Sequence, residues 1–114
     1  MIDVRALSVR APWAGLIAGG VKTIEIRSRR LRYRGELLIC QSRGGGAVAV
    51  VDVLDCRPFV EADDVDSGGV WGLHPETREG HWAWRLRLLR RVTSPTIKGR
   101  LGFFDVDERL LAGS

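Results

Sequence analysis

The sequence holds few of the residues that mark secreted, membrane or redox proteins. Its two cysteines, Cys40 and Cys56, have fifteen residues between them and lie in apolar, strand-like runs, so we expect buried thiols in a reducing compartment. No apolar run approaches the roughly 18 residues of a membrane span, and the start "MIDVRALSVRAPW" lacks the continuous apolar segment of a signal peptide. These absences favour a cytoplasmic protein and disfavour export and membrane insertion.

Motifs for metal, cofactor or nucleophilic chemistry are also missing. His74 and His81 have no cysteine partner at ligand spacing, and "EADDVD" lacks the regular oxygen-ligand spacing of a calcium loop. The sequence contains no P-loop, no glycine-rich dinucleotide fingerprint, and no Ser-His-Asp or Cys-His arrangement. We therefore expect neither a metal nor a cofactor.

Lysine is scarce although the chain is basic. Of 18 basic residues only Lys22 and Lys98 are lysines, and the formal net charge is +4. Residues 1–50 carry nine basic and three acidic groups, residues 51–81 carry two and eight, and residues 82–114 carry seven and three. Because the planar head of arginine suits phosphate and base contacts, the two basic regions favour a nucleic acid or nucleotide ligand.

Length and periodicity predict one domain, residues 1–114, that is mixed α/β and mainly β. Trp13, Leu16 and Ile17 recur at helical spacing between Pro12 and two glycines, which predicts one short helix. The acidic, glycine-rich stretch 60–80 has no sustained period and predicts a surface loop with a turn or short helix. Strands are predicted over residues 23–27, 35–42, 47–59 and 81–92. Residues 4–13 predict a short strand that runs into a turn, and residues 102–111 predict a last strand with a helical turn. Five or six strands with one or two short helices predict a small β-barrel.

A lysine and a glutamate come together where the period changes from helix to strand. Alternation from residue 23 onward places Glu25 and Arg27 on the polar side of a strand, with Lys22 at its entrance. The three side chains could share one pocket and orient a ligand, or act as acid and base if burial shifts a pKa toward neutrality. An ordinary surface ion pair, worth roughly 0 to 1 kcal/mol, is the alternative interpretation.

The segment "LSVRAPWAGLIAGGVKTIEIR" resembles the opening of the ASCH domain family, a branch of the PUA-like fold. Members begin with Ser-x-Arg-x-Pro-Trp, then a helix, then Gly-x-Lys-x-x-Glu-x-Arg. The residues of this chain that match are Ser8, Arg10, Pro12, Trp13, Gly20, Lys22, Glu25 and Arg27. "YRGELLICQS" and the ending "WAWRLRLLRRVTSPTIKGRLGFF" are also similar to the family, so the resemblance covers nearly the whole chain.

The resemblance implies a PUA-like β-barrel with a cleft beside the early helix that binds RNA or nucleotides and is lined by Lys22 and Glu25. A subgroup of similar fold hydrolyses acetylated cytidine with a lysine and a threonine three residues later. Here that later position is Glu25, so the subgroup's nucleophile is missing. We therefore expect binding first, and a hydrolase of a modified nucleoside or of RNA phosphodiesters as the alternative, with Lys22 and Glu25 as its catalytic pair.

Two sets of residues are the candidates for contact with a ligand. The predicted cleft residues are Ser8, Arg10, Trp13, Lys22, Glu25 and Arg27. The run "RSRRLRYRG" interleaves arginines with an aromatic, a pattern suited to phosphate contacts and base stacking. With a tryptophan from a glycine-rich loop, the predicted nucleic-acid contacts are Arg29, Arg30, Arg32, Tyr33, Arg34 and Trp71. A solvated basic loop and a tryptophan that plugs the barrel end are the alternatives.

The acidic middle of the chain leaves a third hypothesis open. A protein partner, as in an antitoxin-like interaction module, could use the acidic stretch 60–80. RNA or a nucleotide is still the partner that the basic regions favour, and no membrane contact is expected.

Overall fold

The computed structural model describes residues 2–74, 76 and 79–113, except the side chain of Trp71. Strands are the most common regular structure among these residues, and all but the short last one fall where the periodicity predicts them. The strands are β1 (Asp3–Val9), β2 (Ile24–Arg27), β3 (Gly35–Gln41), β4 (Ala47–Pro58), β5 (Trp82–Thr93), β6 (Phe103–Asp107) and β7 (Ala112–Gly113). The helices are α1 (Trp13–Ala18) and α2 (Val70–Leu73), with 3-10 turns η1 (Glu61–Asp63) and η3 (Glu108–Leu110).

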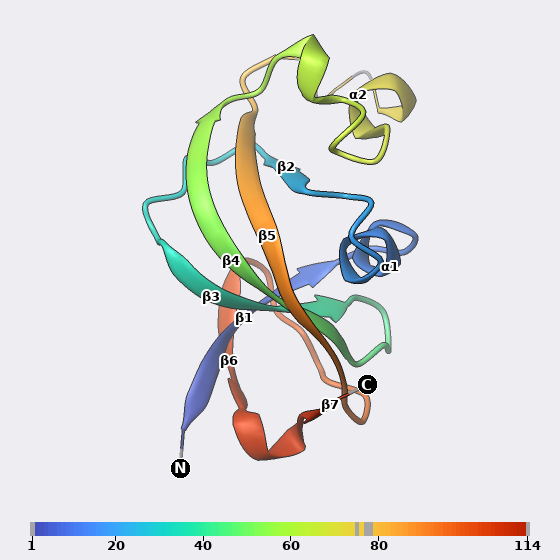
Figure 1. Cartoon of the computed structure of the whole chain (residues 1–114), viewed down its shortest axis with the longest axis vertical. Coiled ribbons are helices and arrows are strands. Elements are labelled where there is room, and N and C mark those ends of the chain that lie inside the picture. The colour runs from blue at the N-terminus through green and yellow to red at the C-terminus, as the bar shows by residue number, and fades with distance from the viewer. Residues whose placement is uncertain (1, 75, 77–78, 114) are drawn as a thin grey trace.

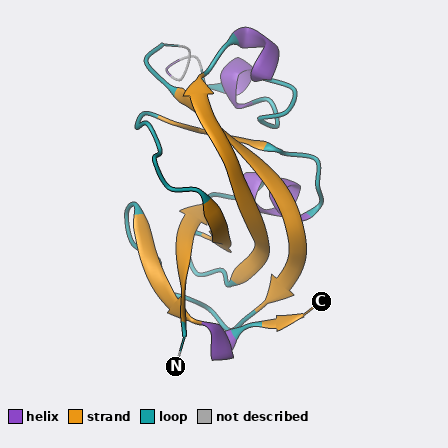
Figure 2. Ribbon diagram, turned by 60° about the vertical axis from the view of Figure 1, so that its left-hand side comes forward, coloured by secondary structure: helices purple, strands orange, loops and turns teal. Residues whose placement is uncertain are grey.

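One sheet holds the fold together. Its strand order is β2-β5-β4-β3-β1-β6, with β7 paired to β5. Only β1 and β3 pair in parallel among the described strands, because α1 and β2 form the crossover that a parallel pair requires. The long β4 and β5 curve strongly across the molecule (Figures 1 and 2).

The chain is therefore mainly β with short helices, as predicted, but barrel closure is not confirmed. The described pairings form a path that ends at β2 on one side and β6 on the other, and these two strands do not pair with each other. No helix in the described residues is long and apolar enough to cross a bilayer.

Both faces of the sheet are covered, which explains the continuous apolar run in β3. Leu37 and Ile39 pack in one core cluster, under α1, while Leu38 and Cys40 pack in a second cluster on the opposite face. A strand whose side chains are buried on both sides loses the alternating pattern of a half-exposed strand. Helix α1 adds Ala14 and Ile17 to the first cluster, so it lies against strands β3, β4 and β5 of the sheet.

The acidic segment after β4 is anchored to the sheet by hydrogen bonds. Arg57 holds the Asp63 carboxylate with two hydrogen bonds of 2.7 and 2.6 Å. The carbonyl of Asp66 accepts hydrogen bonds from the backbone N–H groups of Thr23 and Ile24. Residues 61–73, predicted as a surface loop with a turn or short helix, contain η1 and α2 and lie beside the start of β2 (Figure 1).

The thiol of Cys40 gives a test of the second core cluster. Cys40 and Cys56 are both free, and burial raises the pKa of Cys40 to about 11. We expect the Cys56→Ser variant to resist thiol labelling by Ellman's reagent at pH 8 while folded and to react at once in urea, because the thiolate is the reactive species. Since the unfolded thiol ionises before the folded one, this group should also lower the free energy of unfolding as the pH rises from 9 towards 11. Labelling of the folded variant at the rate of an exposed thiol would contradict the packing.

Candidate functional site

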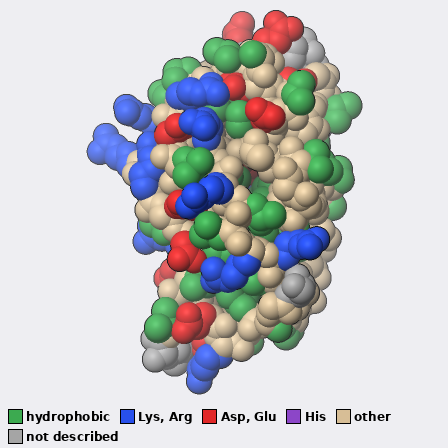
Figure 3. Space-filling model, viewed as in Figure 1, with side chains coloured by type: hydrophobic (Ala, Val, Ile, Leu, Met, Phe, Trp, Pro, Cys, Tyr) green, Lys and Arg blue, Asp and Glu red, His purple; other side chains and the backbone are tan. Residues whose placement is uncertain are grey.

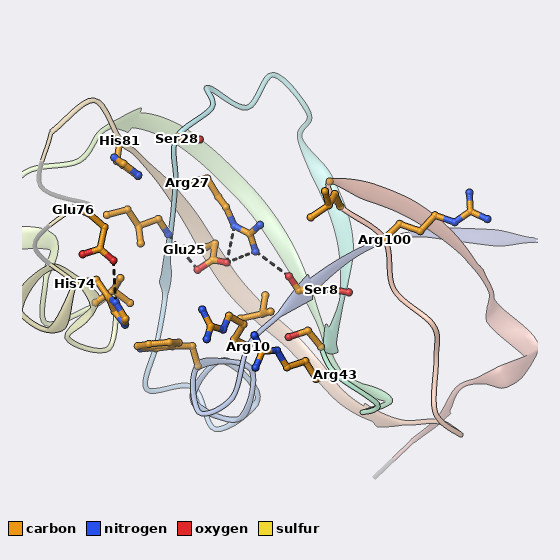
Figure 4. Close-up of a pocket in the computed structure, with 17 residues that line it drawn as sticks. Ser8, Arg10, Glu25, Arg27, Ser28, Arg43, His74, Glu76, His81 and Arg100 are labelled. Atoms are coloured by element: carbon orange, nitrogen blue, oxygen red, sulfur yellow. Dashed lines mark hydrogen bonds and ion pairs between the residues drawn. The ribbon is translucent and has the colours of Figure 1, made fainter.

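A cavity of about 520 Å³ opens between β1, the start of α1, β2 and the connection from β5 to β6. Five of the six predicted cleft residues line it: Ser8, Arg10, Trp13, Glu25 and Arg27. Figure 4 shows Glu25 and Arg27 at its centre, with Ser8, Arg10 and Arg43 on one side and His74, Glu76 and His81 on the other. Segments from the first half, the middle and the last quarter of the chain thus meet at one place.

Lys22, the sixth predicted residue, lies beneath the cavity and does not line it. Gly20, in the left-handed region at φ 78°, ends α1, and the N–H groups of Val21 and Lys22 both turn back to the Leu16 carbonyl. The Lys22 side chain is fully buried, and its Nζ donates to the carbonyls of Ile24 (2.7 Å) and Ser67 (2.5 Å). Burial lowers the pKa of Lys22, and the nearby Glu25 charge opposes this shift.

Glu25 has its acceptor positions occupied by the protein itself. Oε1 lies 3.3 Å from Lys22 Nζ and accepts from the Ile26 N–H at 3.3 Å. Oε2 accepts from Arg27 Nε at 3.0 Å and from Arg27 Nη2 at 2.8 Å. A carboxylate offers about four lone-pair positions, so these four donors leave Glu25 little capacity to accept from a ligand. Glu25 is therefore placed to orient its two cationic neighbours.

Glu25 and Arg27 both line the cavity, and Arg27 is the one of the two with donors left for a ligand. Its Nε and Nη2 bind Glu25, and Nη2 also donates to the Ser8 carbonyl at 3.0 Å. The guanidinium lies 5.8 Å from the ring centroid of Trp84, and 32% of the side chain is exposed. Within the described residues Nη1 makes no hydrogen bond, so a rigidly held N–H pair is available to an acceptor in the cavity.

Three further arginines line the cavity, and two of them were not predicted from the sequence. Arg10, Arg43 and Arg100 are exposed and form no ion pair within the part of the chain that the structure describes. Arg43 and Arg100 lie in the turns before β4 and β6. The sequence could have indicated that they lie in turns, but not that these turns border the cavity. Together with Arg27 they make the cavity electropositive, which attracts anions.

Two histidines complete the opposite wall. The rings of His74 and Trp13 meet edge to face with centroids 5.3 Å apart, and His74 Nδ1 is 3.2 Å from Glu76 Oε1. His81 Nδ1 lies 2.7 Å from the Glu79 carbonyl. From the sequence alone, these histidines are candidates only for metal binding. No cluster of three or more metal-binding side chains occurs among the described residues.

The residues of the second predicted set do not all line the same cavity. Arg29 and Arg30 line a neighbouring cavity, whereas Arg32 and Arg34 line neither. Tyr33 donates to the Glu36 carbonyl at 2.5 Å, and the Arg5 guanidinium lies over its ring at 4.9 Å. One face of Tyr33 is thus covered. The Trp71 side chain lies outside the described residues.

The buried ammonium gives a stability test. Replacing Lys22 by methionine keeps most of the volume but leaves Glu25 with fewer partners and two carbonyls without a donor. We expect a loss of roughly 3–5 kcal/mol in the free energy of unfolding, because removing one member of a buried ion pair strands the other. Lys98→Met changes the only other lysine, which is exposed, and should cost less than about 0.5 kcal/mol. Equal urea midpoints for the two variants would contradict the arrangement.

Comparisons with known proteins place the chain in a family. Residues 7–101 match the model of the ASCH domain. Among solved structures, the chain is similar to the crystal structure of a mutant of the ASCH protein from Zymomonas mobilis, with a TM-score of 0.66 and 15% identity over 94% of this chain and 92% of that chain. At this identity the likeness shows the fold alone, and no curated protein matches the chain. Because the family model spans most of the sequence, the chain belongs to the ASCH domain family.

Proposed function

We propose that this protein binds RNA or a nucleotide in the cavity centred on Arg27. Its family is generally an RNA-binding one. The observation that carries the proposal is the guanidinium of Arg27, fixed by three hydrogen bonds and with Nη1 left for a ligand. A cytoplasmic location, where RNA is available, is part of the proposal.

The roles of the predicted cleft residues follow from their contacts. Lys22 and Glu25 are positioning residues, because the first is buried and the second is already surrounded by donors. Arg27 would donate to a phosphate oxygen or to a base acceptor. Since its donors are fixed before binding, little side-chain entropy remains to be lost when the ligand arrives.

The rim supplies the other contacts that a nucleotide requires. Arg10, Arg43 and Arg100 suit phosphate groups, and the half-buried Trp13 gives an aromatic surface beside them. Phosphate contacts of this kind give affinity that falls as the salt concentration rises. Stacking on an aromatic ring adds affinity with little dependence on the identity of the base.

The hydrolase alternative gains no support from the contacts of Lys22. A lysine that activates water or substrate must reach the reacting atoms, whereas the Lys22 ammonium is fully buried and bonded to two backbone carbonyls. Product analysis after incubation with acetylated cytidine and with RNA remains the direct check. Appearance of product would restore that alternative.

Binding can be tested on the Arg27 guanidinium. We expect fluorescence anisotropy with labelled single-stranded RNA to show that Arg27→Gln weakens binding roughly 10- to 150-fold, because a hydrogen bond to a charged group contributes about 1.5–3 kcal/mol. The dependence of log Kd on log salt concentration should become shallower by about 0.7 for each phosphate that the variant no longer binds. Arg91→Gln removes the same charge from an exposed position on β5 that lines neither cavity, and it should leave Kd nearly unchanged.

Two further measurements keep this test decisive. Circular dichroism and a urea titration establish whether Arg27→Gln is folded, and Arg10→Gln tests the same cavity through an exposed side chain. Absence of RNA binding by the wild-type protein at low salt would refute the proposal. So would equal weakening by Arg27→Gln, Arg10→Gln and Arg91→Gln, which would indicate binding by overall charge alone.

A further inference from the structure

A second cavity, of about 340 Å³, adjoins the first. The two cavities share three residues, Arg27, Ser28 and Gly102, so they meet where β2 ends and β6 approaches. Both volumes lie in the range of about 300–1,000 Å³ that is usual for small-ligand sites. Together the two adjoining cavities offer a longer surface to a ligand than the first cavity alone.

The second cavity has the chemistry of a base-stacking site. Its floor is apolar and aromatic, and is formed by the buried Leu7, Leu31 and Trp84, with 6% of Trp84 exposed, and by the half-buried Phe103. The Trp84 and Phe103 rings pack edge to face, with centroids 6.1 Å apart at 69°. A planar, uncharged group fits against such a floor better than a phosphate does, because aromatic side chains stack on the faces of bases.

The rim of the second cavity is cationic. Arg29 is exposed, and its guanidinium forms no hydrogen bond or ion pair among the described residues. Arg30 also lines this cavity and lies 5.7 Å from the Trp82 ring centroid. An aromatic floor with cations at its edge is the combination found in proteins that bind single strands.

We infer that the two cavities are adjoining subsites for consecutive nucleotides, so that the ligand is single-stranded RNA of at least two nucleotides. The inference rests on the proposed function of the first cavity. Arg27 and Ser28, which border both cavities, would contact the phosphate between the two nucleotides. A base in a duplex is stacked on both faces, so it cannot lie against the half-buried Phe103 ring without leaving the helix.

The indole of Trp84 is a direct reporter of the second subsite. Its Nε1–H donates to the Arg29 carbonyl at 3.0 Å, so a ligand on this floor changes the surroundings of one identifiable proton. We expect the NMR signal of this proton to move when the homodinucleotides ApA, CpC, GpG or UpU are added. It should move much less with the matching nucleoside 5′-monophosphates.

Affinity gives the second readout. At least one homodinucleotide should bind about 5- to 150-fold more tightly than its monophosphate, the contribution of one stacked base. Arg29→Gln should reduce this ratio at least threefold. Arg91→Gln, with the same change of charge at an exposed site away from both cavities, should leave the ratio as it is.

The possible results separate this inference from the proposed function. Equal affinity for monophosphates and dinucleotides, with an unmoved Trp84 signal, would overturn the second subsite and leave the first intact. A reduction of the ratio by Arg91→Gln as large as that by Arg29→Gln would also overturn it, since overall charge would then explain the preference. No binding of either kind of nucleotide, or of longer RNA, would overturn both.

Discussion

A row of three charges, of which Lys22 and Glu25 are buried and Arg27 is partly exposed, determines the geometry of the candidate site. The Lys22 ammonium, the Glu25 carboxylate and the Arg27 guanidinium lie in sequence from the interior to the cavity, with N–O distances of 3.3 and 2.8 Å. Burying charges costs several kcal/mol unless each is paired and hydrogen-bonded. Here each of the three charged groups has an oppositely charged partner in the row, and Lys22 and Arg27 also donate to backbone carbonyls. The excess positive charge of the row therefore appears only at Arg27, on the cavity side.

The fold supplies the partners that this row requires. The Ser67 carbonyl, which accepts from Lys22, belongs to the acidic segment after β4, and that segment is fixed by the Arg57–Asp63 ion pair. The Ser8 carbonyl, which accepts from Arg27, belongs to β1. Strand β2 contributes only four residues, yet it is held between these two segments and by pairing with β5. The site thus depends on the whole sheet.

Some arginines of the chain form ion pairs with nearby carboxylates, and others have no acidic partner among the described residues. On β5, Arg85 and Arg87 pair with Asp55 and Asp52 of the adjacent β4, and Arg90 pairs with Glu36 of β3. Figure 3 shows basic and acidic side chains interspersed over the face of β4 and β5. Around the two cavities, Arg10, Arg29, Arg43 and Arg100 have no such partner among the described residues. Exposed cross-strand pairs contribute little stability, but they reduce the positive charge of that face. The four arginines at the cavities therefore keep their positive charge uncompensated by a neighbouring carboxylate in the described part of the chain.

Some of these features follow from the sequence alone, and others need the tertiary structure. Period-two alternation placed the strands, the spacing of Trp13, Leu16 and Ile17 placed α1, and the motif from Ser8 to Arg27 identified five residues that line the cavity. The local sequence pattern determines these elements and residues, because the spacing of residues sets which side chains point to the same side of a strand or helix. It could not determine that Lys22 turns inward, since its partner Ser67 is 45 residues away. Nor could it separate Arg29 and Arg30, which line a cavity, from Arg32 and Arg34, which do not. Burial and pairing depend on segments that only folding brings together.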